Sequence, residues 1–256
     1  MDTRPRQQTL TLIAIALTFG SGAADVASFT RLGGVFTSVM TGNIVLWGLA
    51  AARGSLTLAA HTAVSIAGYI AGVAAGAWIA HGTKVAPAVK GTVADAAADA
   101  ALARADGQGA LPGSVLWVLL AQLTLLTGFT VGWEVCGAAP AGWAQFALLA
   151  TLAAAMGMQS SAVKDMGLTE VSTTYLTGTL TGLVSSLASP GQDTPHGLRR
   201  FGVLIGLVAG ASLCGLLVAT AADGVPALPL AALVTTIAAA NGLGWRPPPR
   251  RVEEER

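Results

Sequence analysis

The chain has 256 residues, of which 53% are hydrophobic and only 11% are charged, and its formal net charge is +1. A soluble domain carries about 25% charged residues, so this composition argues against a water-soluble protein and suits a lipid bilayer. The balanced charge also argues against a strongly basic face for nucleic acid. We therefore expect an all-α polytopic membrane protein.

Eight apolar segments follow one another along the chain. They are Leu10–Phe29, Val35–Ala52, Leu56–Ala80, Ser114–Trp133, Trp143–Val163, Val171–Leu187, Phe201–Ala222 and Leu228–Leu243. A perpendicular helix needs about 20 residues to cross the hydrocarbon core, so at first sight all eight could be spans.

Lysine and arginine favour fewer crossings. With eight spans and the N-terminus inside, three basic loop residues are cytoplasmic and five are outside, which opposes the positive-inside rule. If Val35–Ala52 and Val171–Leu187 instead enter the membrane and return, six are cytoplasmic and two are outside. The six are Lys84, Lys90, Arg104, Lys164, Arg199 and Arg200. We therefore expect about six spans plus two broken or re-entrant segments, with both termini cytoplasmic; eight full spans are the alternative.

The two unusual segments resemble each other, and each contains a Thr-Gly pair. GVFTSVMTGNIVLWG at 34–48 aligns with EVSTTYLTGTLTGLV at 170–184 with an offset of 136 residues. We call them the first and second TG segments. A GxxxGxxxG ridge follows each, Gly68/Gly72/Gly76 and Gly202/Gly206/Gly210, with an offset of 134. Three spans per half, an odd number, predict an inverted 3+3 repeat of the kind found in many secondary transporters. The alternative is chance similarity in a chain rich in Gly, Thr and Ala.

The repeat defines the expected domains. The first membrane repeat covers 1–133 and includes a cytoplasmic loop at 82–113, the second covers 134–245, and a cytoplasmic tail with basic and acidic residues covers 246–256. Because small residues let helices approach closely, the two glycine ridges could also join copies of the chain into a homo-oligomer.

Two stretches carry a family resemblance. They are AADVASFTRLGGVFTSVMTGNIVLWG at 23–48 and MGMQSSAVKDMGLTEVSTTYLTGTLTGL at 156–183. Together they resemble the YoaK-like family of small bacterial integral membrane proteins, a family of unknown function. The matching residues are Asp25, Phe29, Phe36, Thr41-Gly42-Asn43, Gln159 and Thr173-Thr174-Tyr175-Leu176-Thr177-Gly178. The resemblance implies a bacterial cytoplasmic membrane, a six-helix class, and no established cofactor or substrate.

Asp25 is the most informative ionisable residue, because it lies inside the first apolar segment. A carboxylate costs roughly 2.5–3.5 kcal/mol at the bilayer centre on insertion scales, and less near the interface. It could bind a proton or cation, or anchor the neighbouring broken helix. Alternatively, it pairs with Arg31 or caps the next segment.

The TG pairs and their flanking residues are the best candidates for a substrate-facing lining. They are Thr41, Gly42 and Asn43, with Thr177, Gly178 and Thr179 in the second half, and Phe36 joins them as a motif residue. Glycine lets the backbone leave helical geometry, hydroxyl and amide groups can bind a polar solute, and the amino end of a half-helix suits an anion. Tight helix packing is the alternative.

Gln159, Thr173, Thr174 and Tyr175 are secondary candidates, since one polar group per half could meet at the repeat axis. His61 is expected to be an interfacial or hydrogen-bonded residue, and a proton relay is the alternative. No HExxH, CxxC, Walker or GxSxG motif occurs, so we expect no enzyme, metal or cofactor. Two functions remain: a small secondary transporter or channel-like permease for a polar or anionic solute, proton-coupled through Asp25, or a membrane scaffold or accessory subunit that binds another membrane protein or lipid.

Overall fold

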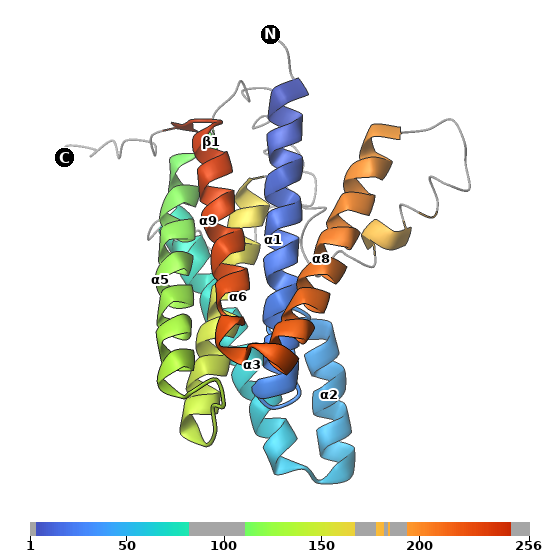
Figure 1. Ribbon diagram of the computed structural model, residues 1–256, viewed down its shortest axis with the longest axis vertical. Coiled ribbons are helices and arrows are strands. Elements are labelled where there is room, and N and C mark those ends of the chain that lie inside the picture. Colours follow the sequence, from blue (N-terminus) through green and yellow to red (C-terminus); the bar gives the residue numbers. More distant parts are fainter. Residues whose placement is uncertain (1–3, 82–110, 167–177, 182–183, 185–193, 247–256) are drawn as a thin grey trace, which may run out of the picture.

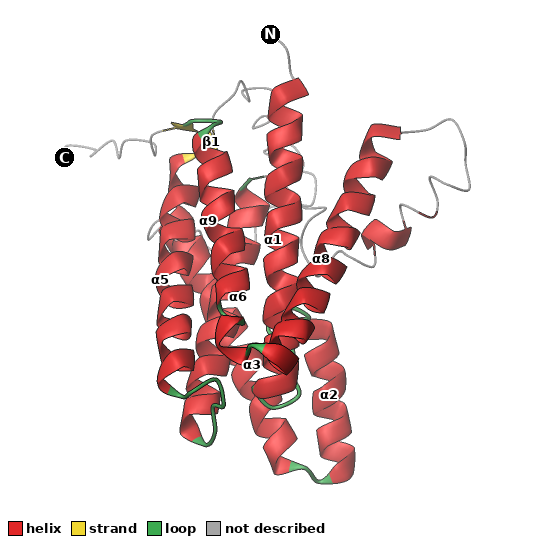
Figure 2. Ribbon diagram, viewed as in Figure 1, coloured by secondary structure: helices red, strands yellow, loops and turns green. Residues whose placement is uncertain are grey.

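The computed structural model describes residues 4–81, 111–166, 178–181, 184 and 194–246. This part of the chain is almost entirely helical, as Figures 1 and 2 show. The helices are α1 (Arg4–Arg31), α2 (Met40–Arg53), α3 (Leu56–His81), α5 (Gly113–Val135), α6 (Trp143–Asp165), α8 (Thr194–Thr220), the 3-10 helix η3 (Ala222–Gly224) and α9 (Ala227–Asn241). Two very short strands, β1 (Leu111–Pro112) and β2 (Trp245–Arg246), pair in parallel and tie the start of α5 to the end of α9.

Within these residues, six helices are long and apolar enough to cross a membrane. They are Gln8–Arg31, Leu56–Ala80, Gly113–Val135, Trp143–Asp165, Arg199–Thr220 and Ala222–Asn241. Helix α2, which contains the Thr-Gly pair of the first TG segment, has 14 residues and is therefore about 21 Å long, shorter than the hydrocarbon core of about 30 Å. The prediction of six spans and a shorter first TG segment is confirmed. The second TG segment falls mostly outside the described residues.

The first TG segment turns back along α1 before α2 begins. Helix α1 ends at Arg31, yet the backbone N–H groups of Thr37 and Ser38 donate to Asp25, six residues before that end. At 1.5 Å per residue the chain therefore returns about 9 Å along α1. Helix α2 then runs away from this point to a tight turn at Gly54, and α3 follows (Figure 1). This is the geometry expected of a segment that enters the bundle and leaves at the same end.

The helix contacts fall into two matching sets. The most extensive contacts join α3 with α6 and α1 with α8, and the next join α1 with α9 and α5 with α6. Exchanging α1 for α6, α3 for α8 and α5 for α9 converts each of these contacts into its counterpart. In Figure 1, α1 starts at the end of the bundle that carries the N-terminus, whereas α6 starts at the opposite end. An inverted 3+3 repeat requires this relation.

The glycine ridges mediate the matching contacts, but in a register that differs from our prediction. A Cβ on Gly72 would lie 2.0 Å from the Ala154 carbonyl oxygen of α6, and one on Gly210 would lie 2.0 Å from the Phe19 carbonyl oxygen of α1. Gly72 and Gly210 are 138 residues apart, so the predicted ridge offset of 134 is wrong by one helical turn. A four-residue spacing of glycines fits several alignments equally well, which explains the error.

Both ridges are covered from within the chain. The ridge of Gly68, Gly72 and Gly76 packs on α6, and the ridge of Gly202, Gly206 and Gly210 packs on α1. The ridges therefore pack on helices of the same chain and leave no free close-approach surface at these glycines, and a homo-oligomer stays a prediction. Backbone approach this close is the usual role of small residues in membrane helices.

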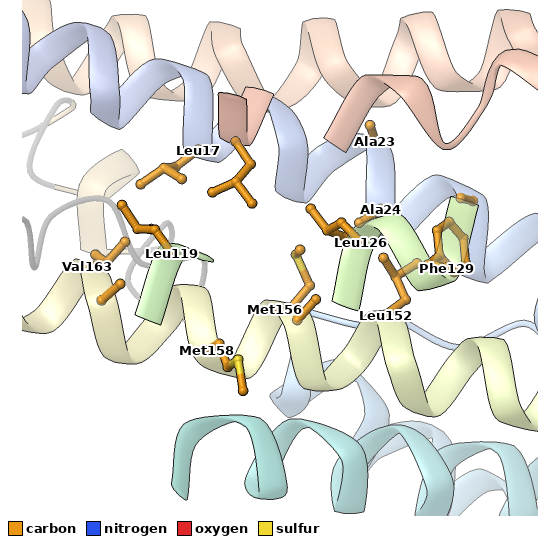
Figure 3. Packing of buried hydrophobic residues seen from close by; sticks show 14 of the residues in the cluster. Leu17, Ala23, Ala24, Leu119, Leu126, Phe129, Leu152, Met156, Met158 and Val163 are labelled. Atoms are coloured by element: carbon orange, nitrogen blue, oxygen red, sulfur yellow. The ribbon is translucent and has the colours of Figure 1, made fainter. Parts of the chain in front are cut away.

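Buried apolar side chains from α1, α5 and α6 fill the centre of the bundle, as Figure 3 shows for Leu17, Leu126 and Met156. Trp133, at the end of α5, is fully buried, and its indole Nε1 donates to the Ala222 carbonyl at 3.0 Å. The indole therefore fixes the end of α5 to η3. Trp78, Trp117 and Trp143 are exposed near helix ends, where an amphipathic ring suits the headgroup layer of a bilayer.

Candidate functional site

The chain reverses its direction in the connection between α1 and α2, which contains the start of the first TG segment. Helix α1 ends where Gly33 and Gly34 adopt φ values of +100° and +75°, a left-handed conformation that other residues rarely adopt. A Cβ at Gly33 would lie 2.0 Å from Cδ2 of His61, so this glycine also permits close approach to α3. These two glycines let the chain reverse and run back toward Asp25.

Asp25 anchors the returning chain. Its side chain is buried, and four donors converge on its two carboxylate oxygens. Oδ1 accepts from the backbone N–H groups of Thr37 and Ser38, each at 2.8 Å, and from the Thr37 hydroxyl at 3.2 Å. Oδ2 accepts a short hydrogen bond from the Ser38 hydroxyl. Asp25 therefore caps the turn that precedes α2, which was one of the roles left open by the sequence.

Arg31, which the sequence offered as an ion-pair partner for Asp25, binds elsewhere. Its guanidinium Nη2 donates to the Val218 carbonyl of α8 at 3.0 Å. Arg31 thus links the end of α1 to the end of a helix in the second half. The backbone amides of the first TG segment bind Asp25 instead.

Asn43 holds the same loop from the other side. Its Oδ1 accepts from the Phe36 N–H at 2.9 Å, and its Nδ2 donates to the Phe36 carbonyl at 2.6 Å. The side-chain amide therefore satisfies both polar groups of one peptide residue, as a neighbouring strand would. Nδ2 also donates to the Ser65 hydroxyl of α3 at 3.1 Å, and Ser65 donates to the Phe36 carbonyl. These bonds join loop, α2 and α3 in one buried polar cluster.

The remaining predicted residues of this segment have different surroundings. The ring of Phe36 stacks on Phe29 with centroids 5.2 Å apart. A Cβ on Gly42 would lie 3.2 Å from that ring, so Gly42 makes room for it. Thr41 is exposed on the outer side of α2, beside Ile44, and does not face the cluster.

Gln159 belongs to a second polar cluster, in the middle of the bundle. Its Oε1 accepts from Gln122 Nε2 of α5 at 3.0 Å, and its Nε2 donates to the Ser21 hydroxyl of α1 at 2.8 Å and to the Leu17 carbonyl at 3.2 Å. The chain of bonds crosses from α6, in the second half, to α1 and α5, in the first. Oε1 of Gln122 is buried and has no hydrogen-bond partner among the described residues.

The structure thus brings together Asp25, Phe36 and Asn43 but places Gln159 in a separate cluster. Gly178 and Thr179 lie in a short helical piece, with Thr179 buried. Thr173, Thr174, Tyr175 and Thr177 lie outside the described residues. Sequence reasoning missed Ser65 and Gln122. Gln122 carried a usable signal, because it is a polar residue in the middle of the apolar run LWVLLAQLTLL.

The comparisons with known proteins agree with this architecture. A family model described as protein of unknown function (DUF1275) matches residues 13–240. The chain belongs to this family. It is 29% identical over 178 residues to the UPF0700 transmembrane protein YoaK of Bacillus subtilis (strain 168). The aligned region covers 70% of this chain and 67% of that protein. No solved structure matches the chain.

The family membership confirms the resemblance drawn from the two TG stretches. Together with the six apolar helices it establishes a multi-pass membrane protein in a lipid bilayer.

Proposed function

We propose that the protein is a small secondary transporter or channel-like permease for a polar solute, and that its two halves move against each other during transport. The observation that carries this proposal is the exchange of helix pairs, in which α1 packs on α8 as α6 packs on α3. Secondary transporters commonly place broken helices from two inverted repeats around a solute site near the bilayer midplane.

Polar side chains at the boundary between the halves support the proposal. Gln122, Gln159 and Ser21 form a hydrogen-bonded chain among otherwise apolar residues. Polar groups inside a membrane bundle are costly and commonly mark solute or ion pathways. Oε1 of Gln122, which has no hydrogen-bond partner among the described residues, can accept a hydrogen bond from a solute or a water molecule when the halves separate.

The first TG segment acts in this proposal as a gate that is closed in the described conformation. Asp25, Asn43 and Ser65 bind its backbone from three sides. Asp25 therefore serves as an anchor of the gate, which is one of the two functional roles that the sequence left open; the other was a proton or cation site. The N–H groups just before α2, which could attract an anionic solute, already bind the Asp25 carboxylate. We therefore favour a polar solute over an anion at this helix end.

The alternative function, a membrane scaffold or accessory subunit, loses its main support. The two glycine ridges and the small size of the chain motivated that hypothesis, and both ridges pack on helices of the same chain. We further propose that the protein is not an enzyme. We also place it in the bacterial cytoplasmic membrane with both termini cytoplasmic, on the basis of the basic loop residues and the family resemblance.

Flux measurements in proteoliposomes test the proposal. Purified protein is reconstituted and screened with a panel of small polar solutes and with a pH-sensitive dye. We expect uptake of at least one solute above empty liposomes, and loss of that uptake in Gln159→Leu. Thr127→Val is the matched control, because Thr127 is exposed on α5 and, within the described part of the chain, its hydroxyl bonds only to the Leu123 carbonyl of its own helix. Uniform absence of flux for the folded wild-type protein would contradict the proposal.

A further inference from the structure

His61 lies about 8 Å from the start of α3 and is buried where α3, α6 and the end of α1 meet. Its Nδ1 lies 2.8 Å from the Thr57 carbonyl oxygen, and its Nε2 lies 3.0 Å from Oε1 of Gln145 on α6. Phe146 stacks on the imidazole ring with centroids 4.2 Å apart. The transport proposal uses none of these contacts.

The orientation of Gln145 follows from its other partner. Its second amide atom lies 2.8 Å from the Arg31 carbonyl oxygen, which can only accept a hydrogen bond. That atom must therefore be the donor Nε2, and the acceptor Oε1 must face His61. Both imidazole nitrogens consequently face oxygen acceptors, because the Thr57 carbonyl also only accepts.

A neutral imidazole cannot satisfy this arrangement. It carries one N–H, so one ring nitrogen would direct a lone pair at an oxygen about 3 Å away. Reversing the Gln145 amide would move the conflict to a contact between Oε1 and the Arg31 carbonyl. Only the doubly protonated ring donates at both ends, and a positive ring over the face of Phe146 gains a cation–π interaction.

We propose that His61 is a proton-binding site, and that its doubly protonated form ties the start of the first TG segment to α3 and α6. The tie runs from the Thr57 carbonyl through His61 and Gln145 to the Arg31 carbonyl, the last residue of α1. Gly33, the second residue after that end, lies against the edge of the imidazole ring. When the ring loses one of its two N–H protons, one of the hydrogen bonds to the Thr57 carbonyl and Gln145 is lost. This loss occurs beside the loop that reverses after α1.

The groups that face His61 in the described structure are neutral. They are the Thr57 carbonyl of α3, Gln145 and Phe146 of α6, and the Gly33 backbone. Arg31 contributes its carbonyl through Gln145, while its guanidinium donates to Val218. Proton binding does not depend on transport; a role for this proton in driving the gate rests on the proposed function.

Nitrogen NMR of the ring tests the proposal without any flux measurement. The full chain, labelled with ¹⁵N-histidine, is studied in lipid nanodiscs at about pH 6.5, and the His61 signals are assigned by their loss in His61→Phe. We expect the wild type to show a population with both ring nitrogens protonated. A ring that stays neutral down to about pH 5 would overturn the proposal.

Two substitutions of Gln145 form a matched pair, because both leave the Arg31 carbonyl without its donor. Gln145→Leu also removes the acceptor opposite His61 Nε2, whereas Gln145→Glu keeps one. We expect Gln145→Leu to lower the ratio of doubly to singly protonated ring by about tenfold, the value of one ordinary hydrogen bond, and Gln145→Glu to keep it at or above the wild-type ratio. Equal ratios in the two variants would refute the site, whether or not the protein transports a solute.

Discussion

Replacing Asp25 with alanine tests the anchor of the first TG segment. The substitution removes four hydrogen bonds, two from the backbone N–H groups of Thr37 and Ser38 and two from their hydroxyls. The hydroxyls can rotate toward other acceptors, but the N–H groups are fixed by the conformation of the loop. Both residues are buried, so water cannot reach the N–H groups without an opening of the loop.

The expected loss follows from those two N–H groups. An unsatisfied buried donor costs about 1–3 kcal/mol, so Asp25→Ala should lower the free energy of unfolding by about 2–5 kcal/mol, allowing for partial relaxation of the loop. Asp25→Asn keeps one oxygen as an acceptor for both N–H groups, and we expect it to cost about 1 kcal/mol. If Asp25 caps the loop, Asp25→Ala lowers the free energy of unfolding more than Asp25→Asn does, and Asp25→Asn lowers it relative to the wild type.

Reversible unfolding in mixed micelles of mild detergent and SDS, followed by tryptophan fluorescence, measures these differences. Thr124→Val is the control, since Thr124 is exposed and its hydroxyl bonds, among the residues that the structure describes, only to the Leu120 carbonyl of its own helix. If Asp25→Ala unfolds with the same free energy as Thr124→Val, Asp25 does not anchor the segment and the reasoning fails.

Three further predictions concern the loop, the ridges and the topology. Asn43→Ala removes the side-chain amide that binds the backbone N–H and carbonyl of Phe36. We expect hydrogen–deuterium exchange at the Phe36 amide to become faster by at least about tenfold, and to stay at the wild-type rate in Thr41→Ala. Equal exchange in the two variants would contradict this role of Asn43. Gly72→Leu places a side chain against the backbone of α6 and should abolish folded protein in membranes. Gly48→Ala is the control, because a Cβ there meets nothing within 4 Å, and it should be neutral or stabilising by up to about 1 kcal/mol. Protein yield and thermal stability measure both effects. A reporter that is active only in the cytoplasm, fused after the last residue, should be active; an inactive reporter would contradict the orientation.

Hydropathy and charge were sufficient to predict the spans. The apolar segments contain about 20 residues each, and the lysines and arginines distinguish six crossings from eight, because both signals come directly from the bilayer. The first TG segment was predicted as an interruption from the same loop charges. Gly33 and Gly34, whose positive φ angles permit the reversal, were not singled out from the sequence.

The contacts of individual side chains could not be predicted in the same way. Asp25 could bind a solute, Arg31 or the backbone of the following loop, and the outcome depends on where the loop at 32–39 folds. No local sequence pattern fixes the position of that loop. The ridge register was ambiguous because successive glycines are one turn apart. His61 was expected to be an interfacial or hydrogen-bonded residue, with a proton relay as the alternative. Its partner Gln145 lies 84 residues away in the sequence, and periodicity does not predict a contact over that separation.

The relative movement of the two halves is the claim on which the proposed transport depends. Gly202 of α8 faces Ile15 of α1, and a Cβ on Gly202 would lie 3.6 Å from Cγ1 of Ile15, so Ile15→Cys with Gly202→Cys can place a disulfide between the halves once Cys136 and Cys214 are replaced by alanine. Solute flux is then measured in proteoliposomes before oxidation, after oxidation and after reduction. The account predicts flux that stops when the disulfide forms and returns when it is reduced. Flux that is equal in the oxidised and reduced protein, or absent in both, would contradict it.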